Sequence, residues 1–106
     1  MPTRFQVEIS EGAKRDVQAI HDHIAKDKPQ AAAKWVDAFY QKARSLSQLP
    51  LRCEIIPEVE TMPLPFRHLL QGNYRIIYLV DEEEKLVVVV GVIRGDRILK
   101  PRHLGF

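Results

Sequence analysis

Two neighbouring apolar segments dominate the pattern of hydrophobic and polar positions along the chain. Residues 73–81 alternate between two faces and are rich in β-branched and aromatic side chains, as in a β-strand. Residues 86–94 are apolar on both faces, which is typical of a strand buried between neighbours. The polar residues 81–85 connect them, so the pattern predicts a hairpin. A hairpin this apolar is not stable alone in water, and other segments must cover it.

A strand and a helix are predicted at the start of the chain. Phe5, Val7 and Ile9 alternate with polar residues, which indicates a strand with one buried face. Ser10 follows at a position typical of a helix N-cap. Apolar residues at three- and four-residue spacing then predict an amphipathic helix to about Lys26, with a polar face. That polar face is expected to carry Lys14, Arg15, Asp16, His21 and Asp22.

A second helix is predicted to begin at Pro29, because proline is favoured in the first turn of a helix. Two helices with so short a connection should form an antiparallel hairpin, whose joint apolar face covers the sheet. The apolar stripe of the second helix consists of Ala32, Trp35, Val36, Phe39, Ala43 and Leu46.

Residues 49–62 are irregular and rich in proline, which predicts a loop running over the surface into an edge strand. Residues 64–70 are expected to be that strand, and residues 71–73 turn it into the hairpin. The order strand, helix, helix and three strands is that of an α+β fold.

The composition is that of an ordinary globular domain. Of the 106 residues, 45% are hydrophobic and 28% charged, and we treat residues 1–106 as one domain with a basic tail at 95–106. The net charge of +2 does not by itself indicate nucleic-acid binding. Cys53 is the single cysteine, so a reducing compartment fits. We expect a cytoplasmic protein, since no signal peptide or membrane segment is recognisable.

A metal centre is not expected. His21 and His23 are two residues apart, so on a helix they cannot form the i, i+4 pair of a zinc helix. We expect no cofactor either.

Several pieces of this sequence, taken in order, resemble one family. The helix that opens after Ser10, the segment Gly-Asn-Tyr-Arg-Ile-Ile-Tyr at 72–78, and Val-Ile-Arg-Gly at 92–95 together resemble the RelE/ParE toxin superfamily. The resemblance spans roughly residues 5–96. It implies a β-α-α-β-β-β fold in which a helical hairpin packs on a small, mostly antiparallel sheet. It also implies the toxin of a bacterial type II toxin–antitoxin pair.

The superfamily divides by chemistry, and the residues can be matched one by one. For a RelE-like member, the resemblance implies a ribosome-dependent mRNA endonuclease, whose site uses basic residues and a C-terminal tyrosine. For a ParE-like member, it implies a protein that poisons DNA gyrase. Arg75 stands where the strand arginine of the RelE pattern belongs, and Arg97 would replace its second arginine. The tail after Arg97 has no tyrosine, and its last residue, Phe106, has no hydroxyl. This departure favours a ParE-like function.

Each candidate residue also has a structural interpretation. Arg75 shares a strand face with Ile77 and Leu79, so it must be paired or reach solvent, and it could bridge an acidic residue or a carbonyl. Tyr74 and Tyr78, on the opposite face, are expected to pack under the helices with their hydroxyls at the rim. The remaining candidates are expected to be ordinary structural or surface residues, namely Trp35 in the core, Cys53 in the loop and a solvated turn at 82–84.

We therefore predict a ParE-like toxin that inhibits DNA gyrase by binding. The resemblance implies a small ParD-like antitoxin as partner, with a segment that folds on binding, but the sequence does not locate its binding surface. We expect target recognition in the basic and flexible C-terminal region, at Arg94, Arg97, Lys100 and Arg102.

Two alternatives remain open. One is a RelE-like, ribosome-dependent mRNA endonuclease that uses Arg75 and Arg97 to stabilise phosphate charge and a histidine such as His68 as acid or base. The other is a non-toxic orphan binding protein of the same fold.

Overall fold

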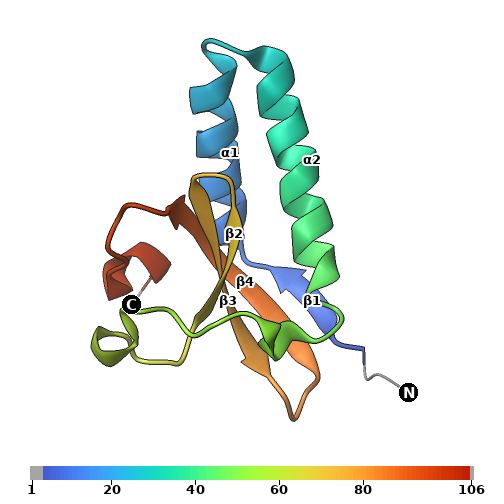
Figure 1. The fold of residues 1–106 in the computed structure, drawn as a ribbon, viewed down its shortest axis with the longest axis vertical. Helices are drawn as coiled ribbons and strands as arrows, with labels where there is room; N and C mark the ends of the chain where they lie inside the picture. Colours follow the sequence, from blue (N-terminus) through green and yellow to red (C-terminus); the bar gives the residue numbers. More distant parts are fainter. Residues whose placement is uncertain (1–3, 106) are drawn as a thin grey trace.

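The computed structural model of the protein describes residues 4–105. Within this range a strand, two long helices and three further strands follow one another (Figure 1). Two 3₁₀ turns lie between the second helix and the second strand, and a third follows the last strand. This order and the packing of the helices on the sheet confirm the predicted α+β fold. The elements are β1 (Gln6–Ile9), α1 (Glu11–Ala25), α2 (Pro29–Ser45), η1 (Pro50–Arg52), η2 (Val59–Thr61), β2 (Arg67–Gln71), β3 (Tyr74–Asp81), β4 (Leu86–Arg94) and η3 (Pro101–Leu104).

The four strands form one mixed sheet in the order β1-β4-β3-β2. β1 pairs with β4 in parallel, whereas the β2–β3 and β3–β4 pairs are antiparallel. β2 lies at an edge, as its prolines predicted, but it begins at Arg67, so Leu64 and Phe66 precede it. Phe66 is nonetheless almost completely buried.

A β-bulge interrupts the pairing of the two central strands. Ile77 lies opposite Gly91 but Tyr78 lies opposite Val89, so Val90 is an extra residue on β4. The bulge reverses the alternation of side chains along β4. Consequently Val89 and Val92, three residues apart, both pack on the helical side of the sheet.

The helices cover one face of the sheet. Ser10 caps α1 by accepting a hydrogen bond from the backbone N–H of Ala13 at 3.0 Å, as its position predicted. The lower parts of both helices supply core residues such as Val17 and Phe39, while the upper half of the hairpin projects beyond the sheet (Figure 1). Only the lower part of the joint apolar face of the two helices therefore covers the sheet. Trp35, expected in the core, is half-buried against Tyr74.

The opposite face of the sheet carries a second core. The loop after α2 and the chain after β4 both run across this face (Figure 1). The loop was expected to stay on the surface, and the tail was expected to be flexible. Both expectations were wrong for the parts that pack here, because each segment supplies fully buried apolar side chains. The buried members of this second core are Ile56, Met62, Phe66, Ile77 and Leu99.

No helix within residues 4–105 is long and apolar enough to cross a membrane.

Candidate functional site

The guanidinium of Arg75 is held inside the second face of the sheet. β3 places it there, because Arg75 alternates with the residues that face the helices. Its Nη1 and Nη2 atoms donate to Oε1 and Oε2 of Glu58 at 3.0 and 2.7 Å, and Nη2 also donates to the carbonyl of Arg97 at 2.7 Å. Only 4% of Arg75 is exposed. This matches the structural interpretation of Arg75, a bridge to an acidic residue and a carbonyl.

Glu58, at the start of η2, joins three segments of the chain. Besides Arg75, its Oε2 accepts a hydrogen bond from the backbone N–H of Leu99 at 2.6 Å. The hydrogen bonds from Arg75 are the main cause that lowers the pKa of Glu58 to about 2. The carboxylate therefore fastens the loop and the tail to β3. Sequence reasoning missed Glu58, since nothing in an irregular loop indicates which acid meets a strand arginine.

His68 belongs to the same cluster. It lies on β2, is 8% exposed, and its Nδ1 accepts from Nη1 of Arg75 at 3.3 Å. Because Arg75 can only donate, Nδ1 must be unprotonated, so the ring proton is on Nε2, 3.2 Å from Oε1 of Glu54. The structure thus brings Arg75 and His68 together, but each is already engaged within the protein.

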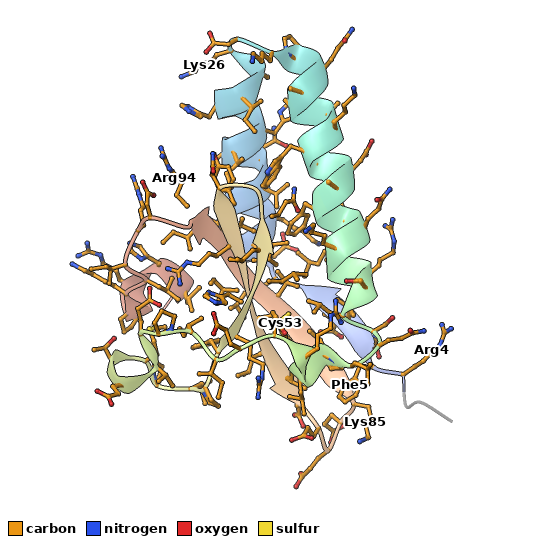
Figure 2. The ribbon with its side chains drawn as sticks, in the orientation of Figure 1. Arg4, Phe5, Lys26, Cys53, Lys85 and Arg94 are labelled. Atoms are coloured by element: carbon orange, nitrogen blue, oxygen red, sulfur yellow. The ribbon has the colours of Figure 1, made fainter. Side chains whose placement is uncertain are left out.

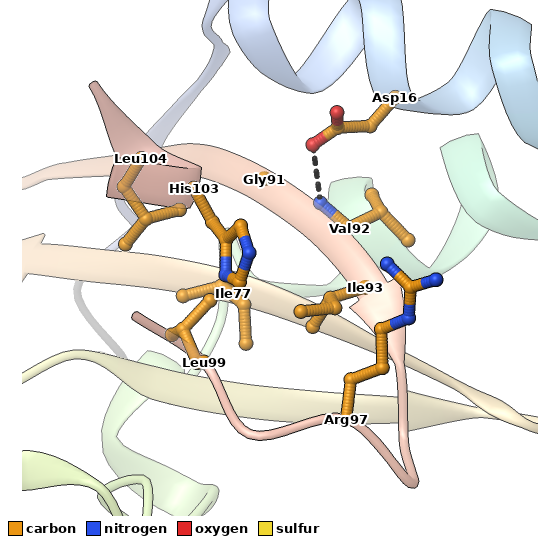
Figure 3. A pocket seen from close by; sticks show the side chains of 9 residues that line it. All are labelled: Asp16, Ile77, Gly91, Val92, Ile93, Arg97, Leu99, His103 and Leu104. Atoms are coloured by element: carbon orange, nitrogen blue, oxygen red, sulfur yellow. Dashed lines mark hydrogen bonds between the residues drawn. The ribbon is translucent and has the colours of Figure 1, made fainter. Parts of the chain in front are cut away.

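Arg97 instead lines a small hollow of about 160 Å³ between the tail and β4 (Figure 3). Asp16 of α1 and His103 of η3 line the same hollow. The Oδ2 atom of Asp16 accepts from the backbone N–H of Val92 at 3.0 Å, next to the bulge. Burial raises the pKa of Asp16, and the hydrogen bond from Val92 opposes this rise.

Asp16 was expected on the polar face of α1, yet it is half-buried against the sheet. It follows Ala13 by three residues, so it lies at the border of the apolar stripe. That spacing was the one available signal of its position. Its role at the bulge could not be read from the sequence, because the bulge itself leaves no clear local pattern.

The imidazole of His103 has a fixed hydrogen-bond role in the structure. Its Nδ1 accepts from the backbone N–H of Lys100 at 3.1 Å. A backbone N–H can only donate, so the proton of the neutral ring is on Nε2.

The four cations predicted to recognise the target are all exposed. Arg94 lies at the end of β4 (Figure 2). It pairs with Asp96 at 3.4 Å. Arg97, Lys100 and Arg102 follow along the tail, on both sides of the buried Leu99. The backbone that carries them is therefore anchored, whereas a freely moving basic tail had been expected. Phe106 lies outside the described residues.

Other singled-out residues have structural positions. The hydroxyl of Tyr78 is buried and donates to the carbonyl of Pro50 at 2.6 Å, so it does not reach the rim as expected. Burial raises the pKa of Tyr78. Cys53 is half-buried against the helical core, and residues 82–84 form an exposed turn. Within residues 4–105 no group of three acidic, histidine or cysteine side chains gathers to hold a metal ion.

Three solved structures from toxin–antitoxin systems have a similar fold. The chromosomal ParDE system of P. aeruginosa aligns with a TM-score of 0.70 and 20% identity, covering 87% of this chain and 97% of the other. The RelBE2 complex of Mycobacterium tuberculosis aligns with a TM-score of 0.59 and 26% identity, covering 89% of this chain and 95% of the other. The RelE–RelB complex of Pyrococcus horikoshii aligns with a TM-score of 0.54 and 17% identity, covering 90% of this chain and 99% of the other. These neighbours have the fold of RelE/ParE toxins, as the resemblance implied.

The family follows from the sequence as well. The family model for the ParE toxin of the type II toxin–antitoxin system parDE matches residues 7–99. This match covers most of the chain, and the chain belongs to the ParE toxin family. No curated protein sequence matches it.

Proposed function

We propose that this toxin acts by binding DNA gyrase and inhibiting it, without cutting RNA. The observation that carries the proposal is the engagement of Arg75. Its guanidinium is sealed against Glu58 and the carbonyl of Arg97, so it cannot contact a substrate phosphate without breaking a buried ion pair. The membership in the ParE family supports the same function.

The surface proposed to meet gyrase is the anchored tail with its four exposed cations. Because Leu99 and the tail backbone are held by Glu58 and Arg75, the cations at 94, 97, 100 and 102 are presented in a fixed arrangement. Such preorganised charge favours the encounter with an acidic partner surface. A cognate antitoxin is proposed as the neutralising partner, as in the ParDE and RelBE complexes of similar fold.

The test is supercoiling of relaxed plasmid by gyrase with the purified protein titrated in, while cleaved DNA is trapped and counted. We expect inhibition with accumulation of cleaved DNA. Alanine at Arg97, Lys100 and Arg102 should weaken inhibition, since the three cations are exposed and their removal leaves Leu99 in place. Truncation after Arg94 is unsuitable as a test, because it would remove Leu99 from the core.

The control replaces two exposed cations of α2, Lys34 and Arg44, by alanine, and it should inhibit as the unchanged protein does. A folded protein with no effect on gyrase would refute the proposal. Equal inhibition by the tail variant would refute the assignment of the surface.

One observation favours the endonuclease as a second candidate. Arg97 and His103 line a common hollow, so a phosphate there could meet a cation and an imidazole (Figure 3). The hydrogen bond from Lys100 opposes this use, because it leaves the neutral ring protonated at Nε2 and unable to accept a proton there. Cuts in ribosome-bound mRNA that disappear in His103→Ala would establish this candidate. A protein that neither inhibits gyrase nor cuts mRNA would be the non-toxic orphan.

A further inference from the structure

The most exposed large apolar side chain among the described residues is that of Ile98, in the tail between β4 and η3. It is 72% exposed, whereas its neighbour Leu99 is 1% exposed and belongs to the second core. An exposed isoleucine adds little to the stability of the fold, because its side chain is not removed from water. The backbone around Ile98 is nevertheless held on both sides.

The buried ion pair holds the chain at the two peptide groups next to Ile98. Nη2 of Arg75 donates to the carbonyl oxygen of Arg97 at 2.7 Å, in the peptide group before Ile98. Oε2 of Glu58 accepts from the N–H of Leu99 at 2.6 Å, in the peptide group after it. Hydrogen bonds to ionised groups are stronger than those between neutral groups. The structure therefore presents an apolar side chain to solvent on a backbone that is fixed in advance.

The surroundings of Ile98 are cationic. Its neighbours along the tail are exposed cations, namely Arg97, Lys100 and Arg102. The one acid of the described tail, Asp96, already pairs with Arg94 at 3.4 Å. A protruding apolar side chain flanked by cations is the complement of an apolar pocket with an acidic rim.

We propose that Ile98 is the apolar anchor of the target interface, and that its side chain enters an apolar pocket with an acidic rim on gyrase. The choice of gyrase rests on the proposed function. In protein interfaces a few side chains in desolvated pockets carry most of the binding energy, whereas charges at the rim mainly set the association rate. Because the ion pair fixes the backbone of Ile98 before binding, little conformational entropy is lost when the side chain is inserted.

A protein pocket fits this side chain better than the DNA that gyrase holds. An apolar wedge enters duplex DNA only by unstacking a base step, which costs free energy before any contact is gained. A preformed pocket on a protein removes the same side chain from water without that cost. Insertion of Ile98 into DNA is the alternative, and binding measured with and without DNA separates the two.

The test is binding of the full-length toxin to immobilised gyrase, with and without a bound DNA fragment, while association and dissociation rates are recorded. Ile98→Ala should raise Kd about tenfold to hundredfold in both cases, mainly through faster dissociation, because the apolar contact forms after encounter. Ile98→Val should raise Kd less than about fivefold, since most of the apolar side chain remains. Alanine at Arg97, Lys100 and Arg102 should instead slow association and weaken its dependence on salt.

The matched control is Leu49→Ala, which removes a side chain of similar exposure, 70%, at the turn that follows α2. The segment after α2, green in Figure 1, lies across the view from the tail. This variant should bind within about twofold of the unchanged toxin, and neither substitution should change thermal stability, because both side chains are exposed.

Three results would count against the anchor. Equal Kd values for Ile98→Ala and Leu49→Ala would overturn it and leave gyrase as the target. A loss of affinity in Ile98→Ala that appears only with DNA present would overturn the protein pocket in favour of DNA. Failure of the folded, unchanged toxin to bind gyrase in either form would overturn both the anchor and the proposed function.

Glu58→Gln tests whether the ion pair positions Ile98. It should raise the Kd of the otherwise unchanged toxin about threefold or more, and it should raise the Kd of Ile98→Ala by a smaller factor, because the two changes act on one contact. Equal factors in both backgrounds, measured where circular dichroism shows all variants folded, would show that the ion pair does not position this side chain.

Discussion

At the scale of single residues, the Arg75–Glu58 pair is the feature with the greatest energetic consequence. Both side chains are largely excluded from solvent, with 5% and 11% exposed. Burying two charges is costly, so such a pair adds little net stability, but the loss of one partner leaves the other unpaired. Here the loss would also release Leu99 and the carbonyl of Arg97, which lie on the tail.

Glu58→Gln should therefore lower the free energy of unfolding by about 3 kcal/mol, at the lower end of what breaking a buried ion pair costs. Urea unfolding followed by circular dichroism measures this change. Glu60→Gln, an exposed neighbour on η2, should change stability by less than about 0.5 kcal/mol. Equal stabilities of the two variants would contradict the assignment of Glu58 as a partner of Arg75.

The same carboxylate makes stability depend on pH. Arg75 lowers the pKa of Glu58 from 4.5 to about 2, so the folded state holds it ionised when the unfolded chain takes up a proton. This stabilisation is complete above about pH 4.5 and is lost as the pH falls towards 2. Over that interval the unchanged protein should lose about 3 kcal/mol more stability than Glu58→Gln, because the amide does not titrate.

At the scale of elements, the bulge in β4 decides how the helix, the sheet and the tail meet. Asp16 of α1 binds the N–H of Val92 just after the bulge, and Leu104 of η3 lies over Gly91. A Cβ at Gly91 would lie 2.9 Å from Cδ2 of Leu104 and 3.2 Å from Oδ2 of Asp16. Position 91 therefore requires glycine, because two side chains approach it closely from different sides.

Gly91→Ala should destabilise the protein by about 1–3 kcal/mol, because the added methyl displaces Leu104 or breaks the Asp16 contact. Gly12→Ala is the matched control. Gly12 lies in the first turn of α1, and an added Cβ there would lie 3.8 Å from its nearest neighbours, an ordinary van der Waals distance, so alanine should leave stability unchanged or raise it by up to about 1 kcal/mol. Thermal unfolding of both variants separates the effect of crowding from that of removing a glycine.

The elements with strong periodicity were predictable, and the irregular ones were not. Ser10, Pro29 and the alternation along β3 located α1, α2 and one of the two central strands, because caps and periodicity are local signals. The bulge at Val90 could not be located from the sequence, since a run of valines suits either register. The burial of Leu99 could not be foreseen either, because it depends on packing against residues that are distant in sequence.

At the scale of the whole molecule, the sheet separates two cores of different origin. The helical core is built from periodic elements, whereas the second core is closed by the loop and the tail. Both closing segments depend on the Arg75–Glu58 pair. Sequence reasoning singled out Arg75 and the cations that the structure leaves exposed, but it did not foresee the contacts of Glu58 or Asp16, because those carboxylates act only through contacts made by folding.

We expect the loop at 57–62 and the tail at 97–104 to open as one cooperative unit in native-state hydrogen exchange. Glu58→Gln should speed exchange in both segments, including the amide of Leu99, while amides of α1 and β3 change only as far as global stability does. Faster exchange in one segment alone would show that the two are independent.

The parallel pairing of β1 with β4 has a consequence for the toxin's synthesis. The first strand to leave the ribosome can find its neighbour only after the last strand has been made, and Leu99 follows later still. The two helices, joined by local contacts, can assemble early, and so can the β2–β3 pair, but the complete sheet must wait for β4. A chain whose translation stops before β4 would therefore lack the strand that joins β1 to the β2–β3 pair, and an interrupted message would yield no completely folded toxin.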